Sequence, residues 1–93
     1  MKVAVSLLAF DFTDLKNQLM EVEKRVDWLH YDVMDGNFVP NISFGPQVLK
    51  DVSKVSGLYK DVHLMIERPH RYIEDFKKAG ADLITFHLEA YEQ

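Results

Sequence analysis

Short apolar runs alternate with amphipathic segments along this 93-residue chain. Four of the runs are rich in β-branched and aromatic residues and are short enough to be buried strands. These expected strands span residues 3–8, 28–33, 60–66 and 83–88. Between them, apolar residues recur every three or four positions, which predicts three helices. The order βαβαβαβ is typical of parallel strands joined by right-handed helical crossovers.

Residues suited to helix ends support the same division of the chain. Asp11 or Thr13 can accept a hydrogen bond as the N-cap of the first helix, whose apolar stripe runs from residue 15 to residue 26. Pro46 suits the first turn of the second helix, where its missing N–H is not needed. Pro69 is expected to start the third helix, and Gly80 to end it.

The two faces of the expected strands differ in chemistry. Side chains alternate along a strand, and one alternating set is almost entirely apolar, as a helix-covered face should be. The other set carries polar groups towards the carboxyl ends of the strands: Ser6; His30 and Asp32; Asp61 and His63; Thr85, His87 and Glu89. Met34 and Met65 belong to the same set.

A polar second face decides between two kinds of α/β fold. A doubly wound sheet has helices on both faces and should be apolar on both. In a (β/α)8 barrel the second face points inward, and catalytic groups gather at the carboxyl ends of the strands. Because a complete barrel takes about 250 residues, the α/β pattern predicts the first half of a (β/α)8 TIM barrel, with residues 1–93 as a single, partial domain.

The residues with the clearest chemistry are His30, Asp32 and His63. His30 and Asp32 are two positions apart on one strand, and His63 faces the same way on the next. Two imidazoles and a carboxylate suit Zn²⁺, Fe²⁺, Mn²⁺ or Co²⁺; the alternative is a pair of buried histidines hydrogen-bonded to carboxylates. Asp32 could also act as a general base beside a metal, or serve only as a ligand.

Other residues on this face allow both a functional and a structural interpretation. The hydroxyl of Ser6 could bind a substrate oxygen or simply be satisfied in the core. Met34 and Met65 could line a pocket or fill the core. His87 and Glu89 are expected to point inward on the fourth strand.

The connection after the second strand, residues 34–45, is longer than the roughly 2–6 residues usual for such loops. It carries Phe38, Val39, Ile42 and Phe44, which are too apolar for a fully solvated excursion. A lid over the site or a contact between subunits is therefore expected.

Composition limits the classes of partner. The chain is 47% hydrophobic and 28% charged, with a net charge of −4 and interspersed signs. This argues against a nucleic-acid or membrane partner, but one group of backbone N–H donors could still hold a phosphate. The absence of cysteine excludes disulfides and Cys-based zinc modules and fits a cytoplasmic protein. The first apolar run is too short to span a bilayer.

Two long motifs identify a family that this chain resembles. Residues 30–36 (HYDVMDG) with 38–41 (FVPN), and residues 61–66 (DVHLMI) followed by Pro69, closely resemble the two signatures of the ribulose-phosphate 3-epimerase family. Residues 6–8 (SLL) and 79–82 (AGAD) match its first and fourth βα steps. The resemblance covers essentially the whole chain in order.

The resemblance implies a metal-dependent isomerase of a phosphorylated ketopentose, interconverting D-ribulose 5-phosphate and D-xylulose 5-phosphate through an enediolate. It implies one divalent metal ion held by His30, Asp32 and His63, with Asp32 also the proton acceptor. It further implies that Ser6 and His63 contact the substrate, that Met34 and Met65 line the pocket, and that the full-length protein is a homo-oligomer. The family's fourth ligand and its phosphate-binding glycine loops lie in the C-terminal half of the barrel.

Two alternatives stay open at this point, and a third is disfavoured. A sibling epimerase of D-allulose 6-phosphate shares the same barrel and metal chemistry. Decarboxylase and hexulose-phosphate-synthase relatives use an Asp-x-Lys-x-x-Asp motif; here Met34 stands in place of that lysine, which argues against them. Finally, the chain could be an inactive half-barrel, and the 93 residues alone are expected to be inactive and to associate through open strand edges.

Overall fold

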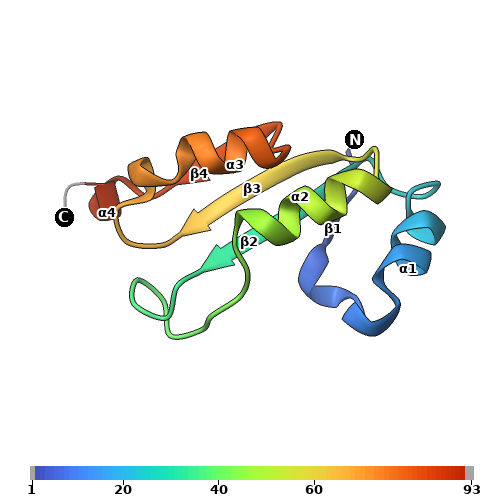
Figure 1. Ribbon diagram of the computed structural model, residues 1–93, viewed down its shortest axis with the longest axis horizontal. Coiled ribbons are helices and arrows are strands. Elements are labelled where there is room, and N and C mark those ends of the chain that lie inside the picture. Colours follow the sequence, from blue (N-terminus) through green and yellow to red (C-terminus); the bar gives the residue numbers. More distant parts are fainter. Residues whose placement is uncertain (1, 92–93) are drawn as a thin grey trace.

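Four parallel strands lie side by side in sequence order, β1-β2-β3-β4, in a computed structural model that describes residues 2–91 (Figure 1). The strands are β1 (Ala4–Ser6), β2 (Trp28–Met34), β3 (Tyr59–Met65) and β4 (Leu83–Phe86). The α-helices are α1 (Leu15–Val22), α2 (Pro46–Val55), α3 (Ile73–Ala79) and α4 (Leu88–Tyr91). Short 3-10 turns, η1 (Leu7–Ala9), η2 (Phe12–Asp14) and η3 (Pro69–Arg71), complete the connections. The predicted βαβαβαβ order and parallel sheet, the first half of a TIM-barrel arrangement, are confirmed.

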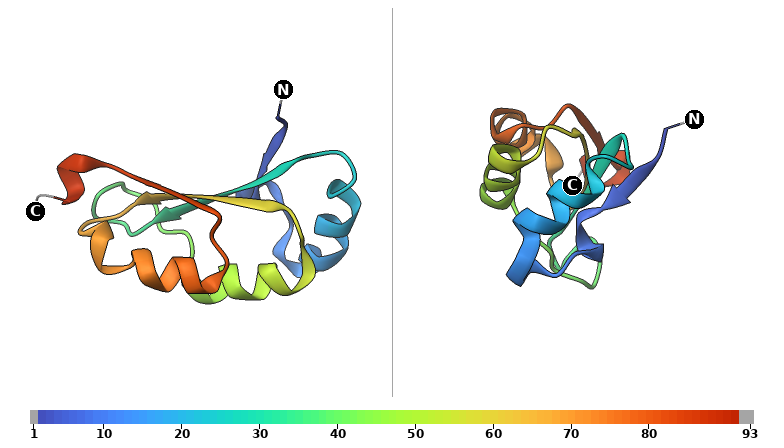
Figure 2. Two further views of the ribbon diagram at one scale, coloured as in Figure 1. Left: turned by 90° about the horizontal axis from the view of Figure 1, so that it is seen from above. Right: turned by 90° about the vertical axis from the view of Figure 1, so that its right-hand side faces the viewer.

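Helices α1, α2 and α3 all lie on one side of the sheet, and the other side is bare in the described residues (Figure 2). The helix-covered face supplies the core: Leu29, Tyr31, Val62 and Leu64 are fully buried between sheet and helices. The predicted division of β2 and β3 into an apolar and a polar face is therefore confirmed. Since no helix covers the polar face, it is the face that points inward in a closed barrel.

The ends of the elements differ from the sequence prediction where local hydrogen bonds redirect the chain. The first strand stops at Ser6, because its Oγ accepts a hydrogen bond from the N–H of Leu8 and caps the 3-10 turn η1. The fourth strand stops at Phe86, and a helical turn follows in which Ala90 N donates to His87 O. The prediction that Glu89 lies on this strand is therefore wrong, since Glu89 belongs to α4.

Two helices are shorter than predicted. The first ends at Val22 and gives way to a turn in which the N–H groups of Arg25 and Val26 both donate to Val22 O. The third begins at Ile73, because Pro69 opens a 3-10 turn before it. Gly80 ends this helix, as predicted. Its φ of +120° is a backbone conformation that only glycine tolerates well. Within residues 2–91, every helix is too short or too polar to cross a membrane.

Candidate metal centre

Neighbouring strands bring three candidate ligands together on the bare face of the sheet. His30 and Asp32 are two residues apart on β2 and so lie on the same side of the sheet. His63 of β3 stands directly opposite Asp32 in the parallel register. One possible ligand atom from each residue lies within 4.8 Å of the others. The three side chains therefore lie close together on one face of the sheet, as predicted.

A single carboxylate oxygen is at the centre of the group. Asp32 Oδ1 lies 2.7 Å from His30 Nε2 and 3.6 Å from His63 Nδ1. All three side chains are partly buried, with Asp32 the least exposed at 18%. Two imidazole nitrogens and one carboxylate oxygen form a mixed donor set of the kind that divalent transition metals prefer. The donor chemistry and the spacing thus both fit a metal ion.

Each histidine also has a partner for its second ring nitrogen. His30 Nδ1 lies 3.1 Å from Asp61 Oδ2, and His63 Nε2 lies 3.0 Å from His87 Nε2. Such outer partners fix the orientation and tautomer of metal-binding histidines. Sequence reasoning placed Asp61 on the correct face but assigned it no role. The only signal in the sequence was its place on the polar face of β3; that Asp61 stands opposite His30 is known from the register of the folded sheet.

Electrostatics favour the neutral form of His63. Partial burial lowers its pKa below 6.5, the neighbouring His87 lowers it further, and the carboxylate of Asp32 opposes them only in part. A neutral imidazole has a lone pair on one ring nitrogen, and that lone pair is what a metal ion binds. The environment of His63 therefore suits a ligand.

The remaining predicted site residues lie around this group. Ser6 stands opposite His30 in the β1–β2 register, so its side chain is at the edge of the same surface. Met34 and Met65 stand opposite each other at the carboxyl ends of β2 and β3. Glu89 lies on α4 with a side chain that is 70% exposed, and it approaches the group only through His87.

The long connection after β2 is anchored both to the site and to the core. The ring of Phe38 lies 5.2 Å from the ring of His87, whereas Phe44 packs 4.5 Å from Tyr31. Asp35 bridges to Ile42 across the loop, and Ile42 is 80% exposed. Part of the loop therefore borders the candidate centre. Its role as a lid or subunit contact stays a prediction.

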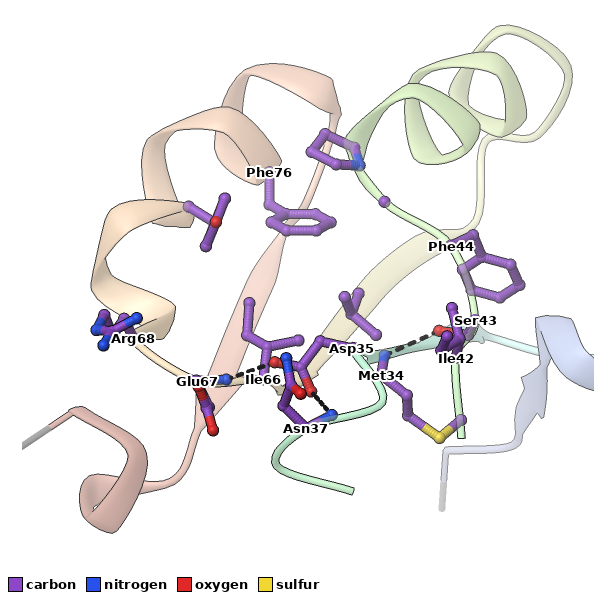
Figure 3. A pocket seen from close by; sticks show the side chains of 14 residues that line it. Met34, Asp35, Asn37, Ile42, Ser43, Phe44, Ile66, Glu67, Arg68 and Phe76 are labelled. Atoms are coloured by element: carbon purple, nitrogen blue, oxygen red, sulfur yellow. Dashed lines mark hydrogen bonds between the residues drawn. The ribbon is translucent and has the colours of Figure 1, made fainter. Parts of the chain in front are cut away.

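A well-formed cavity in the described residues lies on the helix-covered side of the sheet, near the carboxyl ends of β2 and β3. It has a volume of about 460 Å³ and lies between the starts of α2 and α3, where Phe76 and Ile66 of the helix-covered side line it (Figure 3). None of the three candidate ligands lines this cavity. The sheet face that carries the candidate ligands forms only one wall of a barrel. The candidate site is therefore identified by its donor chemistry and not by this cavity.

Comparisons with known proteins agree with these observations. The sequence model of the "Ribulose-phosphate 3 epimerase family" matches residues 2–93. The ribulose-phosphate 3-epimerase of Bacillus subtilis is 54% identical over 90 residues, which are 96% of this chain and 42% of that protein. The enzyme of the same name from Treponema pallidum is 51% identical over 89 residues, 95% of this chain and 41% of that protein. The chain thus spans about two fifths of the length of these curated relatives.

Proposed function

Because this chain belongs to the ribulose-phosphate 3-epimerase family, we propose that the protein containing it interconverts D-ribulose 5-phosphate and D-xylulose 5-phosphate. The observation that carries the proposal is the group of His30, Asp32 and His63, whose ligand atoms lie within 4.8 Å of one another on the barrel-facing side of the sheet. The names of the relatives favour ribulose phosphate over allulose phosphate as the substrate.

The metal site would use one divalent ion, Zn²⁺, Fe²⁺, Mn²⁺ or Co²⁺. His30 would bind through Nε2 and His63 through Nδ1, since these nitrogens face Asp32 Oδ1. When bound, the ion would supply positive charge that stabilises the negative charge developing on the substrate oxygens. The outer contact of His30 with Asp61 would hold the imidazole in place during this step.

Asp32 is the residue that we assign to proton transfer at C3. Both histidines approach its Oδ1, so we assign the second oxygen, Oδ2, to accept the proton. A carboxylate can remove a proton next to a carbonyl when the resulting enediolate is stabilised nearby. Ser6 and His63 would contact substrate oxygens, and Met34 and Met65 would line the pocket beside the reacting carbons.

The rest of the active protein follows from the same proposal. We place residues 1–93 within a single barrel domain whose remaining strands would supply the phosphate site and the opposing acid. A phosphorylated ketopentose is the proposed substrate and a homo-oligomer the proposed assembly. A cytoplasmic setting stays a prediction from the sequence.

Exchange of the C3 proton with solvent tests the assignment directly. In the complete natural chain that contains residues 1–93, Asp32→Asn should abolish deuterium incorporation from heavy water in at least one substrate direction, because an amide cannot accept the proton. Asp51→Asn is the matched control, since Asp51 is an exposed carboxylate on α2. If Asp32→Asn retains more than roughly a tenth of wild-type exchange, a loss too small for a general base, the role of Asp32 is wrong.

A further inference from the structure

The ring of His63 is held on two sides by groups of different chemistry. Its Nδ1 faces Asp32 Oδ1 at 3.6 Å, and its Nε2 lies 3.0 Å from Nε2 of His87. A neutral imidazole carries one proton, so one of its nitrogens donates and the other accepts. If Nδ1 is to offer a lone pair to a metal ion, the proton must be on Nε2, and it must be donated to His87.

His87 has the contacts needed to act as that acceptor. If its Nε2 accepts, its own proton is on Nδ1, and Nδ1 lies 3.7 Å from Glu89 Oε1. The helical turn that starts after β4 places Glu89 beside His87, because Ala90 N donates to His87 O. The ring of Phe38, from the loop after β2, packs against the same imidazole. The ring of His87 is therefore fixed by three separate segments of the chain.

We infer that His87 is a positioning residue that holds His63 in the tautomer with the proton on Nε2 and so leaves Nδ1 available for the metal ion. Glu89 supports it by stabilising the proton on His87 Nδ1. The inference rests on the metal site of the proposed function and adds a residue to it. The two candidate histidine ligands would then be oriented by different groups: His30 by the carboxylate of Asp61, and His63 by the imidazole of His87.

The tautomer can be measured without any metal. Two-bond ¹H–¹⁵N correlation spectra of the metal-free complete chain, at a pH where His63 is neutral, distinguish protonation at Nε2 from protonation at Nδ1. The proton is expected on Nε2 of His63 and on Nδ1 of His87. A spectrum with the proton on Nδ1 of His63 would overturn the inference. Because the measurement uses the unmodified protein, it does not depend on whether any variant folds.

Variants then test the consequence for metal binding, with Co²⁺ as the probe in competition with a chromophoric chelator. His87→Leu removes the acceptor and should weaken Co²⁺ binding by about 10- to 100-fold, the range for lost outer partners of metal-binding histidines. His87→Gln keeps an acceptor oxygen and should recover most of the affinity. Thr85→Val is the matched control, because Thr85 lies on β4 two residues before His87 and stands opposite His63 in the register. Its Co²⁺ affinity should equal that of the wild type.

The outcomes separate this inference from the proposed function. A wild-type chain that binds no Co²⁺ would refute the metal site itself. A wild type that binds Co²⁺, with His87→Leu binding equally well and showing the same visible absorption bands, would leave the metal site intact and refute the role of His87. Equal weakening in the leucine and glutamine variants would also refute it, because the acceptor would then not be what matters.

Discussion

Asp35 connects the two loops that leave the candidate site, and its removal gives the sharpest test of how the site is held. The residue follows β2 directly, and its Oδ1 accepts hydrogen bonds from the N–H groups of Asn37 and Phe38, each at 2.9 Å. Its Oδ2 accepts a third, also at 2.9 Å, from the N–H of Glu67 in the loop after β3 (Figure 3). One carboxylate thus holds together the loop that follows β2 and the loop that follows β3.

These three hydrogen bonds set the expected loss in the free energy of unfolding. A hydrogen bond to a charged group contributes about 1.5–3 kcal/mol, but Asp35 is only partly buried and two donors share one oxygen, so Asp35→Ala should cost about 2–3 kcal/mol in total. Asp35→Asn can offer an acceptor to only one of the two loops and places N–H groups against each other at the second. We expect it to cost about 1–2 kcal/mol.

Urea unfolding of the complete chain, followed by circular dichroism, measures these costs. Asp51→Ala is the control, because this exposed carboxylate on α2 accepts from the flexible side chain of Gln47 and pairs with that of Lys54. Its loss should change stability by less than about 0.5 kcal/mol. If Asp35→Ala and Asp51→Ala have the same free energy of unfolding, the three hydrogen bonds do not hold the loops as the geometry indicates.

The pH dependence of the Asp35 effect has a defined sign. Partial burial raises the pKa of Asp35, but the backbone hydrogen bonds from Glu67, Asn37 and Phe38 outweigh it, so the pKa lies below 3.8. The carboxylate therefore contributes its full stabilisation above pH 3.8 and loses it as the pH falls through the lowered pKa. The stability difference between wild type and Asp35→Ala should shrink below pH 3.8. A constant difference down to full acid unfolding would contradict this account.

Three further predictions follow from the fold. Tyr31→Phe should cost about 1–3 kcal/mol in urea unfolding, because the buried hydroxyl donates to Gly45 O, which would be left without it. Gly80→Ala should cost about 2–3 kcal/mol, because the φ of +120° is strained for alanine and the new Cβ would overlap Ser53 Oγ. Gly45→Ala is its control: the φ is −114° and the described residues leave the Cβ position open, so less than about 1 kcal/mol is expected. Residues 1–93 expressed alone should associate through the open edges of β1 and β4 and show no epimerase turnover. A monomeric mass in analytical ultracentrifugation, together with turnover, would contradict that expectation.

The sequence by itself determined the order of the elements and the chemistry of each sheet face. Both follow from short-range rules: apolar spacing separates strands from helices, and alternation puts His30 and Asp32 on one side. The grouping of the three candidate ligands was therefore predictable, since two are neighbours on one strand and the third lies at an equivalent position of the next. The two long motifs identified the family for the same reason, because the residues that carry the chemistry are close in sequence.

Only the tertiary structure decided which residues support these ligands. Asp61 partners His30 because the β2–β3 register sets them opposite each other. His87 lies just after β4, two residues beyond Thr85, which is the register partner of His63, and its ring nitrogen meets that of His63. The register itself is set over whole strands by which face is buried, not by local propensity. Likewise, the end of β4 and the turn into α4 moved Glu89 from the expected strand to the far side of His87. Spacing along a strand gives the direction of a side chain, but the distance between two side chains on different elements is fixed only when those elements pack.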